Sequence, residues 1–362
     1  MSLSLFKKKA FVGIDLGSAA IKVVQVERTG DAWKITRSAV VSTPTESVKD
    51  GVVVDIDAVG LCIKSALKQG RISATSAIIA VAGGSVIVRT VRIPKMAEAT
   101  LRKSIKFEAG RYVPSSIEDS FIEFEILGDA PEGQMDVLIV ASPREIVESR
   151  IAACAKAGLE VEIVDIEAFA MFRSLIEAHN DRGLSAETIA LVDVGAQTTN
   201  VSVVSNGVFA MTRTIPQAGK TLSEALKTYF KLDDADAEQG KSQLDLGSLL
   251  MEGQVMENPP LRILQPHIDE LIREIRRSLN YYQSQQTESG QPKPVTRLVL
   301  SGGGAKLAGL APYFEHKLGL PVSCSGIYDN PRFIASNGQP DDAGLELAVA
   351  SGLAMRAFAK GA

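Results

Sequence analysis

The sequence is poor in the residues that build disulfide frameworks and metal centres. Its 362 residues include only three cysteines and three histidines. Cys62, Cys154 and Cys324 are odd in number and far apart, which is typical of reduced, buried thiols. A disulfide-stapled fold and a zinc-cysteine framework are therefore excluded. The histidines show no metal-ligand spacing, so we expect no histidine-based metal site.

Long apolar runs and a surplus of positive charge are missing as well. No stretch reaches the roughly 18 apolar residues that a membrane-spanning helix needs, and the N-terminus lacks the apolar core of a secretory signal. The formal net charge of -4 argues against nucleic acid as the main partner. We therefore expect a protein of the cytosol with no nucleic-acid partner and no transmembrane segment.

The chain does have length and an ordinary globular composition. Hydrophobic residues make up 45% of the sequence and charged residues 23%. A chain of 362 residues exceeds the ~250–300 residues at which a single core usually stops growing. At least two packed units are therefore expected.

The first nine residues, MSLSLFKKK, form a basic tail. Leu3, Leu5 and Phe6 alternate with polar residues ahead of three consecutive lysines. Such a segment can touch anionic lipid, although each lysine contributes only about 1 kcal/mol near a membrane. A frayed end is the other interpretation, and the sequence leaves both open.

Residues 10–84 have the pattern of a β-rich α/β unit. The run from 10 to 28 predicts two strands joined by a tight turn at 15–18. A third strand, a helix and a short buried strand are expected at residues 33–41, 61–68 and 76–82.

Residues 85–160 predict an inserted module. Strands and helices follow one another in the order βαββαβ, and VEIVDI is the closing strand. Pro114 ends the first of its helices, because proline cannot continue a helix. The first unit then continues at 161–186 with a helix at 168–178.

The second half, residues 187–340, begins as the first half does. IDLGSAAIKVV is matched by VDVGAQTTNVSVV, and Asn206-Gly207 between two strands predicts a hairpin. Two copies of domain size indicate an internal duplication rather than a solenoid.

An insertion at about 217–295 follows in this half. It is expected to contain a helix from Gly219 to Thr228, a polar stretch around 237–241 and a surface loop at 244–260. An amphipathic helix should begin after Pro266, followed by a linker at 285–294. A buried strand at 298–300 and a helix from Leu307 come next. Residues 341–362 close the chain with a buried apolar helix, at 344–358, that returns to the first unit.

The turn after the first strand has the composition of a phosphate cradle. Gly17 and Ser18 can point backbone amides at phosphates, because glycine lets the backbone come close. Asp15 can hold a hydrated Mg²⁺, and Lys22 can reach back to the phosphates. The second copy supplies Asp193, Gly195, Ala196, Gln197 and Thr198.

Two strand-terminal aspartates that face one another need a cation, because close, unpaired carboxylates repel. For Asp15 and Asp193 this requirement predicts a bound divalent metal beneath a triphosphate. The segment LVLSGGG brings flexible backbone to a third strand end, where an adenine or ribose can lie flat. Its glycines are Gly302, Gly303 and Gly304.

GIDLGSAAIK, LVDVGAQTTNVSVV and LVLSGGGAKLAGL resemble the phosphate-1, phosphate-2 and adenosine motifs of the actin, DnaK and sugar-kinase superfamily. This resemblance implies an α/β actin-like ATPase fold, in which two lobes of duplicated mixed-sheet domains surround a nucleotide cleft. ATP and Mg²⁺ are the cofactors that it implies.

The resemblance also implies roles for residues outside these turns. AEQGK resembles the AExxK element, so Glu238 and Lys241 should flank the ribose and adenine, with Gly219 among the cofactor contacts. Glu167 stands where the superfamily has the residue that positions the attacking water, which makes Glu167 and Asp193 the catalytic candidates. Ala196 and Gln197 stand where many members have glycine, so ATP binding is better supported than hydrolysis.

The inserted module resembles subdomain 1C of FtsA and of the PilM family, the cytoplasmic actin-like proteins of type IV pilus assembly. LFKKK, VRIPKM, KFEAGRYVP, VDIEAFA and EIRRSLNYY favour PilM. This resemblance implies a bacterial protein recruited to the inner face of the inner membrane by the cytosolic N-terminal tail of a PilN-like protein. Phe107, Tyr112 and Val113 would then wall the groove for that tail; packing of the helix on its sheet is the alternative.

Other members of the superfamily remain as alternatives. A small-molecule kinase would need a further base aimed at a substrate hydroxyl, and no convincing aspartate is found beyond the metal pair. An FtsA-like filament-forming anchor predicts a C-terminal linker and amphipathic helix, whereas residues 344–362 read as a buried helix. The sequence leaves open whether ATP is hydrolysed and whether the protein associates with itself or with other pilus components.

Overall fold

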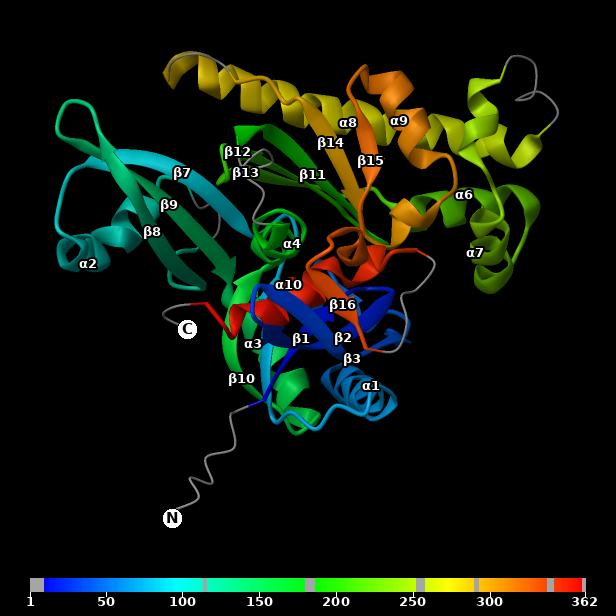
Figure 1. Ribbon diagram of the computed structural model, residues 1–362, viewed down its shortest axis with the longest axis horizontal. Helices are drawn as coiled ribbons and strands as arrows, with labels where there is room; N and C mark the ends of the chain where they lie inside the picture. Colours follow the sequence, from blue (N-terminus) through cyan, green and yellow to red (C-terminus); the bar gives the residue numbers. More distant parts are fainter. Residues whose placement is uncertain are drawn as a thin grey trace.

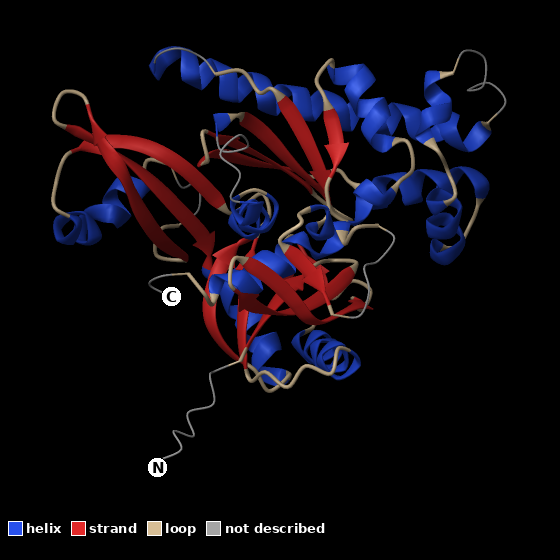
Figure 2. Ribbon diagram, viewed as in Figure 1, coloured by secondary structure: helices blue, strands red, loops and turns tan. Residues whose placement is uncertain are grey.

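The computed structural model describes residues 10–112, 116–179, 186–251, 258–289, 293–336 and 342–359. The basic tail and Val113, named above for lipid and partner contact, lie outside these ranges. Figures 1 and 2 show a mixed α/β molecule with two large sheets and a smaller third sheet to one side. The expected two-lobed α/β architecture is confirmed.

The first lobe is built on a six-stranded sheet in the order β10-β6-β1-β2-β3-β16. Its central strands are almost wholly apolar and are buried on both faces, as expected for strands covered by helices on each side. The strands are β1 (Phe11–Leu16), β2 (Ala20–Thr29), β3 (Ala32–Ser42), β6 (Ser76–Val81), β10 (Glu160–Ile166) and β16 (Phe333–Ala335).

Helices cover both faces of this sheet. On one face α1 (Ile56–Gln69) and α3 (Arg144–Lys156) bury Val12, Ile14 and Ile79. On the other face lie α4 (Glu167–Leu175) and α10 (Ala348–Arg356). A small hairpin of β4 (Val48–Lys49) and β5 (Val52–Val53) packs at the edge.

The second lobe repeats this plan with a five-stranded sheet in the order β13-β12-β11-β14-β15. Asp15 pairs with Lys22 between β1 and β2, and Asp193 pairs with Asn200 at the matching place between β11 and β12. The expected duplication is thus confirmed at the level of strand register. The strands are β11 (Thr188–Val194), β12 (Thr199–Ser205), β13 (Val208–Ile215), β14 (Arg297–Ser301) and β15 (Val322–Cys324).

The predicted hairpin after β12 is present, with Asn206 and Gly207 at φ angles of 51° and 72°. The helices of this lobe are α6 (Gly219–Phe230), α7 (Asp234–Ser242), α8 (Pro259–Ser289) and α9 (Leu310–Leu318). Short 3-10 turns occupy Glu177–His179, Leu246–Leu250, Gly303–Lys306, Ile327–Asp329 and Leu345–Leu347.

One continuous core joins the two lobes. It contains Ile78 of the first sheet, Leu191 and Val299 of the second sheet, and Ala170 and Leu353 of α4 and α10. In Figure 1, α4 and α10 accordingly lie between the two sheets. The two lobes therefore share buried apolar surface and cannot separate without exposing it.

A three-stranded sheet in the order β7-β9-β8 stands beside the first lobe. Its strands are β7 (Ile87–Pro94), β8 (Ser120–Ala130) and β9 (Gln134–Pro143), and α2 (Glu98–Ala109) packs on it around a separate core. We call these four elements the inserted sheet.

The expectation that residues 85–160 and the strand VEIVDI form a self-contained βαββαβ module is corrected here. Strand β10 pairs with β6 in the first lobe, and α3 packs against α1 and β6 through Ala153 and Cys154. The order of elements along the chain does not show which sheet a helix or strand joins. Here α3 and β10 pack on the large sheet, where they bury apolar side chains.

Three further expectations are wrong in detail in the second lobe. Helix α8 begins at Pro259 and runs through Pro266, so Pro266 does not mark its start. The residues expected as a linker belong partly to this helix, which ends at Ser289. Leu246, in the expected surface loop, is fully buried under α9. Buried contacts of Leu264 and Ile268 hold α8 together across the proline.

Candidate nucleotide-binding site

Two acidic strand ends, one from each lobe, converge between the two large sheets. Asp15 lies near the end of β1 and is 8% exposed, and Asp193 occupies the equivalent place in β11. Burial, followed by the negative charge of Asp15, raises the pKa of Asp193 to about 6. The two carboxylates are therefore close enough to repel one another, which fits the expected cation between them.

Lys22 supplies a positive charge to this pair. Its Nζ donates to Asp15 Oδ2 at 3.0 Å. Burial acts to lower the pKa of Lys22, but the charge of Asp15 and its hydrogen bond, together with Asp193 and Glu167, leave that pKa raised above its ordinary value. Lys22 is thus held in its charged form by three carboxylates.

Glu167 joins the same cluster from the first residue of α4. Burial first, and then the negative charge of Asp15, raise its pKa to about 8, against the opposing charges of Arg150 and Lys22. The sequence therefore located four side chains that come together, namely Asp15, Lys22, Glu167 and Asp193.

Sequence reasoning missed Arg150, which reaches this cluster from α3. The side chain is buried, and its Nη1 lies 3.8 Å from Glu167 Oε1. No motif marks it: Arg150 is one of several charged residues on a helix whose other face is apolar. A single buried arginine cannot be told from an exposed one by spacing alone.

The glycines of the two phosphate turns are needed for close backbone approach. A Cβ on Gly17 would lie 2.7 Å from the carbonyl oxygen of Ala20, and one on Gly195 would lie 2.8 Å from that of Thr198. Threonines support both turns: Thr43 Oγ1 donates to Gly17 O in the first turn, and Thr199 Oγ1, directly after the second turn, donates to Gln217 O, each at 2.7 Å.

The remaining predicted residues lie in or beside the two turns. Ser18 is half-buried between β1 and β2. Gly195 N–H donates to Thr198 O at 3.0 Å, and Ala196 O accepts from Lys220 N–H at 2.7 Å. Gln197 lines an open pocket beside α6.

The expected ribose and adenine residues are joined to the second phosphate turn. Gly219 N–H, at the start of α6, donates to Gly195 O at 3.2 Å. From α7, Lys241 Nζ donates to Gly219 O at 3.3 Å, to Ser223 Oγ at 2.9 Å and to Glu238 at 2.8 Å. Glu238 and Lys241 are thus brought together with Gly219, as the resemblance implies.

The three consecutive glycines after β14 differ in what they require. Gly302 has a φ of +89°, and a Cβ there would lie 2.2 Å from Asp193 Oδ1. A Cβ on Gly304 would lie 2.4 Å from Val194 Cγ1, whereas Gly303 faces open space. Gly302 and Gly304 therefore allow this turn to pack directly on the end of β11.

Two residues link the two lobes by an ion pair. Lys220 Nζ of the second lobe lies 3.7 Å from Glu46 Oε1, which follows β3 in the first lobe. Both side chains are largely exposed, so the pair contributes little to stability by itself.

A divalent cation fits the acidic centre. A metal beside Asp193 would offset the negative charge of Asp15, which with burial raises the pKa of Asp193. Within the ranges given above, no group of three or more His, Cys, Asp or Glu side chains could enclose an ion. A magnesium ion bound there would take its other ligands from water and phosphate, as Mg²⁺ usually does.

The residues expected to wall a partner groove lie at the end of α2. Phe107 is 70% exposed, and the guanidinium of Arg111 lies 5.5 Å above its ring. Tyr112 is half-buried against the core of the inserted sheet, with Arg89 at 5.3 Å from its ring. Only Phe107 of this pair is free to meet a partner with most of its side chain.

Across the part of the chain that the structure describes, none of the helices is both apolar enough and long enough to span a bilayer.

Comparisons with known proteins agree with this fold. The family model described as type IV pilus assembly protein PilM matches residues 13–358. A solved PilM–PilN type IV pilus biogenesis complex is similar with a TM-score of 0.84 and 26% identity, covering 97% of this chain and 99% of that chain.

More distant relatives share the fold. Cell division protein FtsA of Streptococcus pneumoniae is 24% identical, covering 86% of this chain and 74% of FtsA. FtsA of Escherichia coli K12 is 21% identical over 89% of this chain and 86% of its own length. MreB 5 of Spiroplasma citri, solved with AMPPNP, has a TM-score of 0.52 at 14% identity and covers 98% of this chain and 97% of its own.

These relatives confirm the actin-like ATPase fold expected from the sequence. The family match extends from the first phosphate turn to the C-terminal helix. The chain therefore belongs to the PilM family of type IV pilus assembly proteins.

Proposed function

We propose that this protein is an ATP-binding scaffold of type IV pilus assembly, in which nucleotide-dependent closure of the two lobes alters a surface for a PilN-like partner. The observation that carries the nucleotide part is the convergence of Asp15 and Asp193 from two duplicated hairpins, with the raised pKa of Asp193 as its electrostatic sign. Such an acidic centre, framed by glycine turns, suits a metal-bound polyphosphate.

Each residue of the site has a separate proposed role. Asp15 and Asp193 would hold Mg²⁺ through water or directly, while backbone amides of the turns at residues 17–18 and 196–198 would face the phosphates. Lys22 would leave Asp15 for a phosphate when the metal takes its place. Glu167 would position a water for attack on the γ-phosphorus, and the rate is expected to be slow.

The partner is proposed from the PilM–PilN complex to which this chain is similar. A PilN-like tail in the cytosol would recruit the protein to the inner face of the inner membrane. Phe107, Tyr112 and Val113 are the proposed groove residues, because an extended peptide needs apolar contacts beside a strand edge. Closure of the lobes changes affinity for the tail only if the two lobe arrangements bind it unequally.

Calorimetry with ATP–Mg²⁺ and with a synthetic PilN-like N-terminal peptide, singly and together, tests the proposal. Each ligand is expected to bind. Asp193→Ala should weaken ATP at least about tenfold without unfolding the protein, since it removes one of the two carboxylates that hold the metal. Asp57→Ala is the matched control, because Asp57 is exposed on α1 and pairs with Lys156.

Two outcomes would contradict parts of the proposal. ATP binding without peptide binding removes the partner role and leaves the nucleotide role. Transfer of phosphate from ATP to an added sugar would instead support the kinase alternative.

A further inference from the structure

The buried cation on α3 has no role in the scheme above. Arg150 is 3% exposed, although a charged side chain is expensive to remove from water unless it is paired and hydrogen-bonded. Packing alone therefore does not explain why this charged side chain is buried beside the acidic cluster.

The guanidinium of Arg150 is fixed from two directions by backbone carbonyls. Nε donates to Gly51 O at 2.9 Å, in the turn between β4 and β5, and Nη1 donates to Ala80 O at 2.7 Å, in β6. The adjacent Ser149 Oγ accepts from Val53 N–H at 3.1 Å. Two consecutive residues of α3 thus clasp the 51–53 segment and the end of β6.

The nearest opposite charge to this fixed guanidinium is Glu167. The two side chains are 4% and 15% exposed, and Nη1 and Oε1 are 3.8 Å apart. Both backbone bonds hold the guanidinium in one orientation. Its positive charge therefore lies in a defined place beside the carboxylate of Glu167.

The start of α3 is joined to the inserted sheet. The helix begins at Arg144, directly after β9 ends at Pro143. Arg144 N–H donates to Asp119 O at 2.9 Å, and Arg144 Nε donates to Glu118 O at 3.1 Å, so this end of α3 is tied to the segment before β8. Less than two turns of α3 therefore separate the contact with the inserted sheet, at Arg144, from the acidic cluster, at Arg150.

We propose that Arg150 is a positioning residue, which fixes the carboxylate of Glu167 for its role toward nucleotide from a helix anchored in the inserted sheet. This inference rests on the proposed function for the role of Glu167, while the contact between the two residues does not. Arg150 itself acts only through Glu167.

A double-mutant cycle on the full chain separates this role from simple packing. At about pH 9, above the pKa of Glu167, Arg150→Met should lower the thermal midpoint by about 5 °C, because it leaves an ionised Glu167 buried beside like charges. In the Glu167→Gln background the same change should cost less than half as much, since the amide needs no counter-charge. Equal costs in both backgrounds would overturn the proposal.

ATP hydrolysis supplies the readout that a packing role would not move. Arg150→Met should lower kcat about tenfold, per nucleotide-binding site, with KM for ATP changed less than about twofold. Arg150→Lys, which keeps the cation, should recover part of the loss. A wild-type kcat in Arg150→Met, or an equal loss in Arg150→Lys, would overturn the proposal.

The two readouts fail independently. If the wild-type protein binds no ATP, the proposed function fails, and the thermal cycle still decides whether Arg150 and Glu167 are coupled. If ATP binds without turnover, Glu167 positions no attacking water, and the positioning role is overturned whatever the thermal cycle shows.

Discussion

Single residues at the cleft are constrained by space as much as by charge. Gly302 and Gly303 are neighbours in sequence, yet only Gly302 has a positive φ and a carboxylate where its Cβ would stand. The glycines of a nucleotide motif are therefore not equivalent, and the structure distinguishes those that backbone approach requires from those that it tolerates.

We expect Gly302→Ala to weaken ATP binding strongly and to destabilise the fold by about 1–3 kcal/mol, because the new methyl meets Asp193 and the left-handed backbone is strained. Gly303→Ala is the matched control and should change both quantities little. Urea unfolding and ATP titration of the two variants measure this difference. Equal effects of the two alanines would contradict the assignment.

The acidic cluster predicts a pH dependence of stability in the metal-free protein. The pKa of Glu167 is raised from an ordinary 4.5 to about 8, so between these pH values the folded state keeps a proton that the unfolded state releases. The free energy of unfolding should therefore fall as pH rises through this window. Glu167→Gln removes this decline.

We expect Glu167→Gln to be more stable than the wild type by at least ~1 kcal/mol at pH 8.5 in EDTA, with a smaller gain at pH 5. Denaturant unfolding at both pH values measures the change. Glu148→Gln on the exposed side of α3 serves as control and should show no such trend. A pH-independent gain would mean that Glu167 is ionised throughout.

Much of the candidate site could be predicted from the sequence, because its residues lie at strand ends or in the turns that follow them. Asp15 and Asp193 each close an apolar run and precede glycine, so local pattern and chemistry agree. Arg150 could not be predicted, since its partners Gly51, Ala80 and Glu167 come from three separate segments that only the tertiary fold brings together.

At the scale of elements, helix α8 shows how tertiary packing overrides a local signal. Proline favours the first turn of a helix, so Pro266 alone predicts a helix start there. Pro259 provides an earlier start, where Asn258 Oδ1 accepts a hydrogen bond from Leu261 N–H. The apolar residues on both sides of Pro266 lie in one core, so a single long helix buries more surface than two short ones.

Replacing this internal proline should therefore stabilise the protein. Pro266 is exposed, so Pro266→Ala restores a backbone N–H without opening a cavity. We expect a gain of about 1 kcal/mol, because the missing helical bond costs more than the proline saves in the unfolded chain. Pro259→Ala, at the first helical position, is the control and should be neutral or slightly destabilising in thermal unfolding.

Two helices differ in what they make visible to sequence reasoning. Helix α7 contains the AEQGK element but was predicted only as a polar stretch, because Ala237 is its sole buried residue and no apolar period marks it. By contrast, α10 is apolar on all sides and was predicted as buried, in agreement with the structure. Periodicity finds helices that face a core and overlooks those held by polar contacts.

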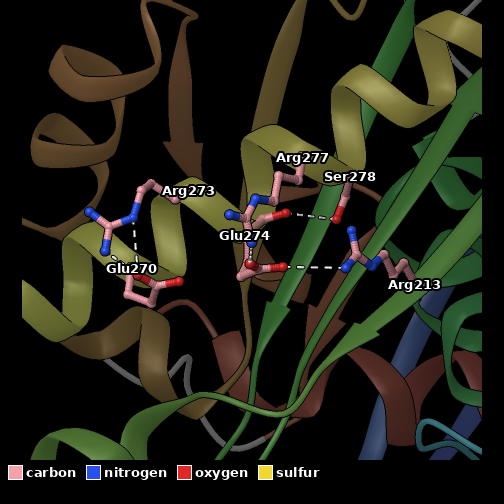
Figure 3. A network of polar contacts seen from close by, with 6 residues as sticks. All are labelled: Arg213, Glu270, Arg273, Glu274, Arg277 and Ser278. Carbon is pink, nitrogen blue, oxygen red and sulfur yellow. Dashed lines mark hydrogen bonds and ion pairs between the residues drawn. The ribbon is translucent and has the colours of Figure 1, made fainter.

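The polar surface of α8 is held by contacts of this second kind. Figure 3 shows Arg213 of β13 reaching Glu274 of α8 across the gap between sheet and helix, at 3.3 Å. Arg277 also contacts Glu274, and Ser278 Oγ donates to Glu274 O at 2.9 Å. Nearby, Arg273 pairs with Glu270 within the helix. Of these contacts only Arg213–Glu274 links α8 to its sheet, since the others lie within the helix, and exposed pairs add little stability individually.

For the whole molecule, the distribution of cores predicts which part opens first. The two lobes share one core between α4 and α10, whereas the inserted sheet has a small core of its own. The free energy of local opening is lowest where opening breaks the fewest apolar contacts. The inserted sheet should therefore be the least protected part of the regular structure.

Hydrogen exchange followed by mass spectrometry tests this expectation. Peptides from β7, β8 and α2 should exchange at least about tenfold faster than peptides from β1, β11 and α10. Saturating ATP–Mg²⁺ should slow exchange around both phosphate turns. Equal protection of the inserted sheet and the central strands would show that the molecule opens only as a unit.

Strand β16 and helix α10 carry a consequence for biosynthesis. They complete the first sheet and cover its inner face, yet they come from the last part of the chain, after the whole second lobe. A polypeptide emerging from the ribosome would therefore hold β1, β2 and β6 with one apolar face only partly covered, by α4, until residues 333–356 have been translated. Such a nascent chain would depend on chaperones, and fragments lacking these residues should aggregate rather than yield an isolated first lobe.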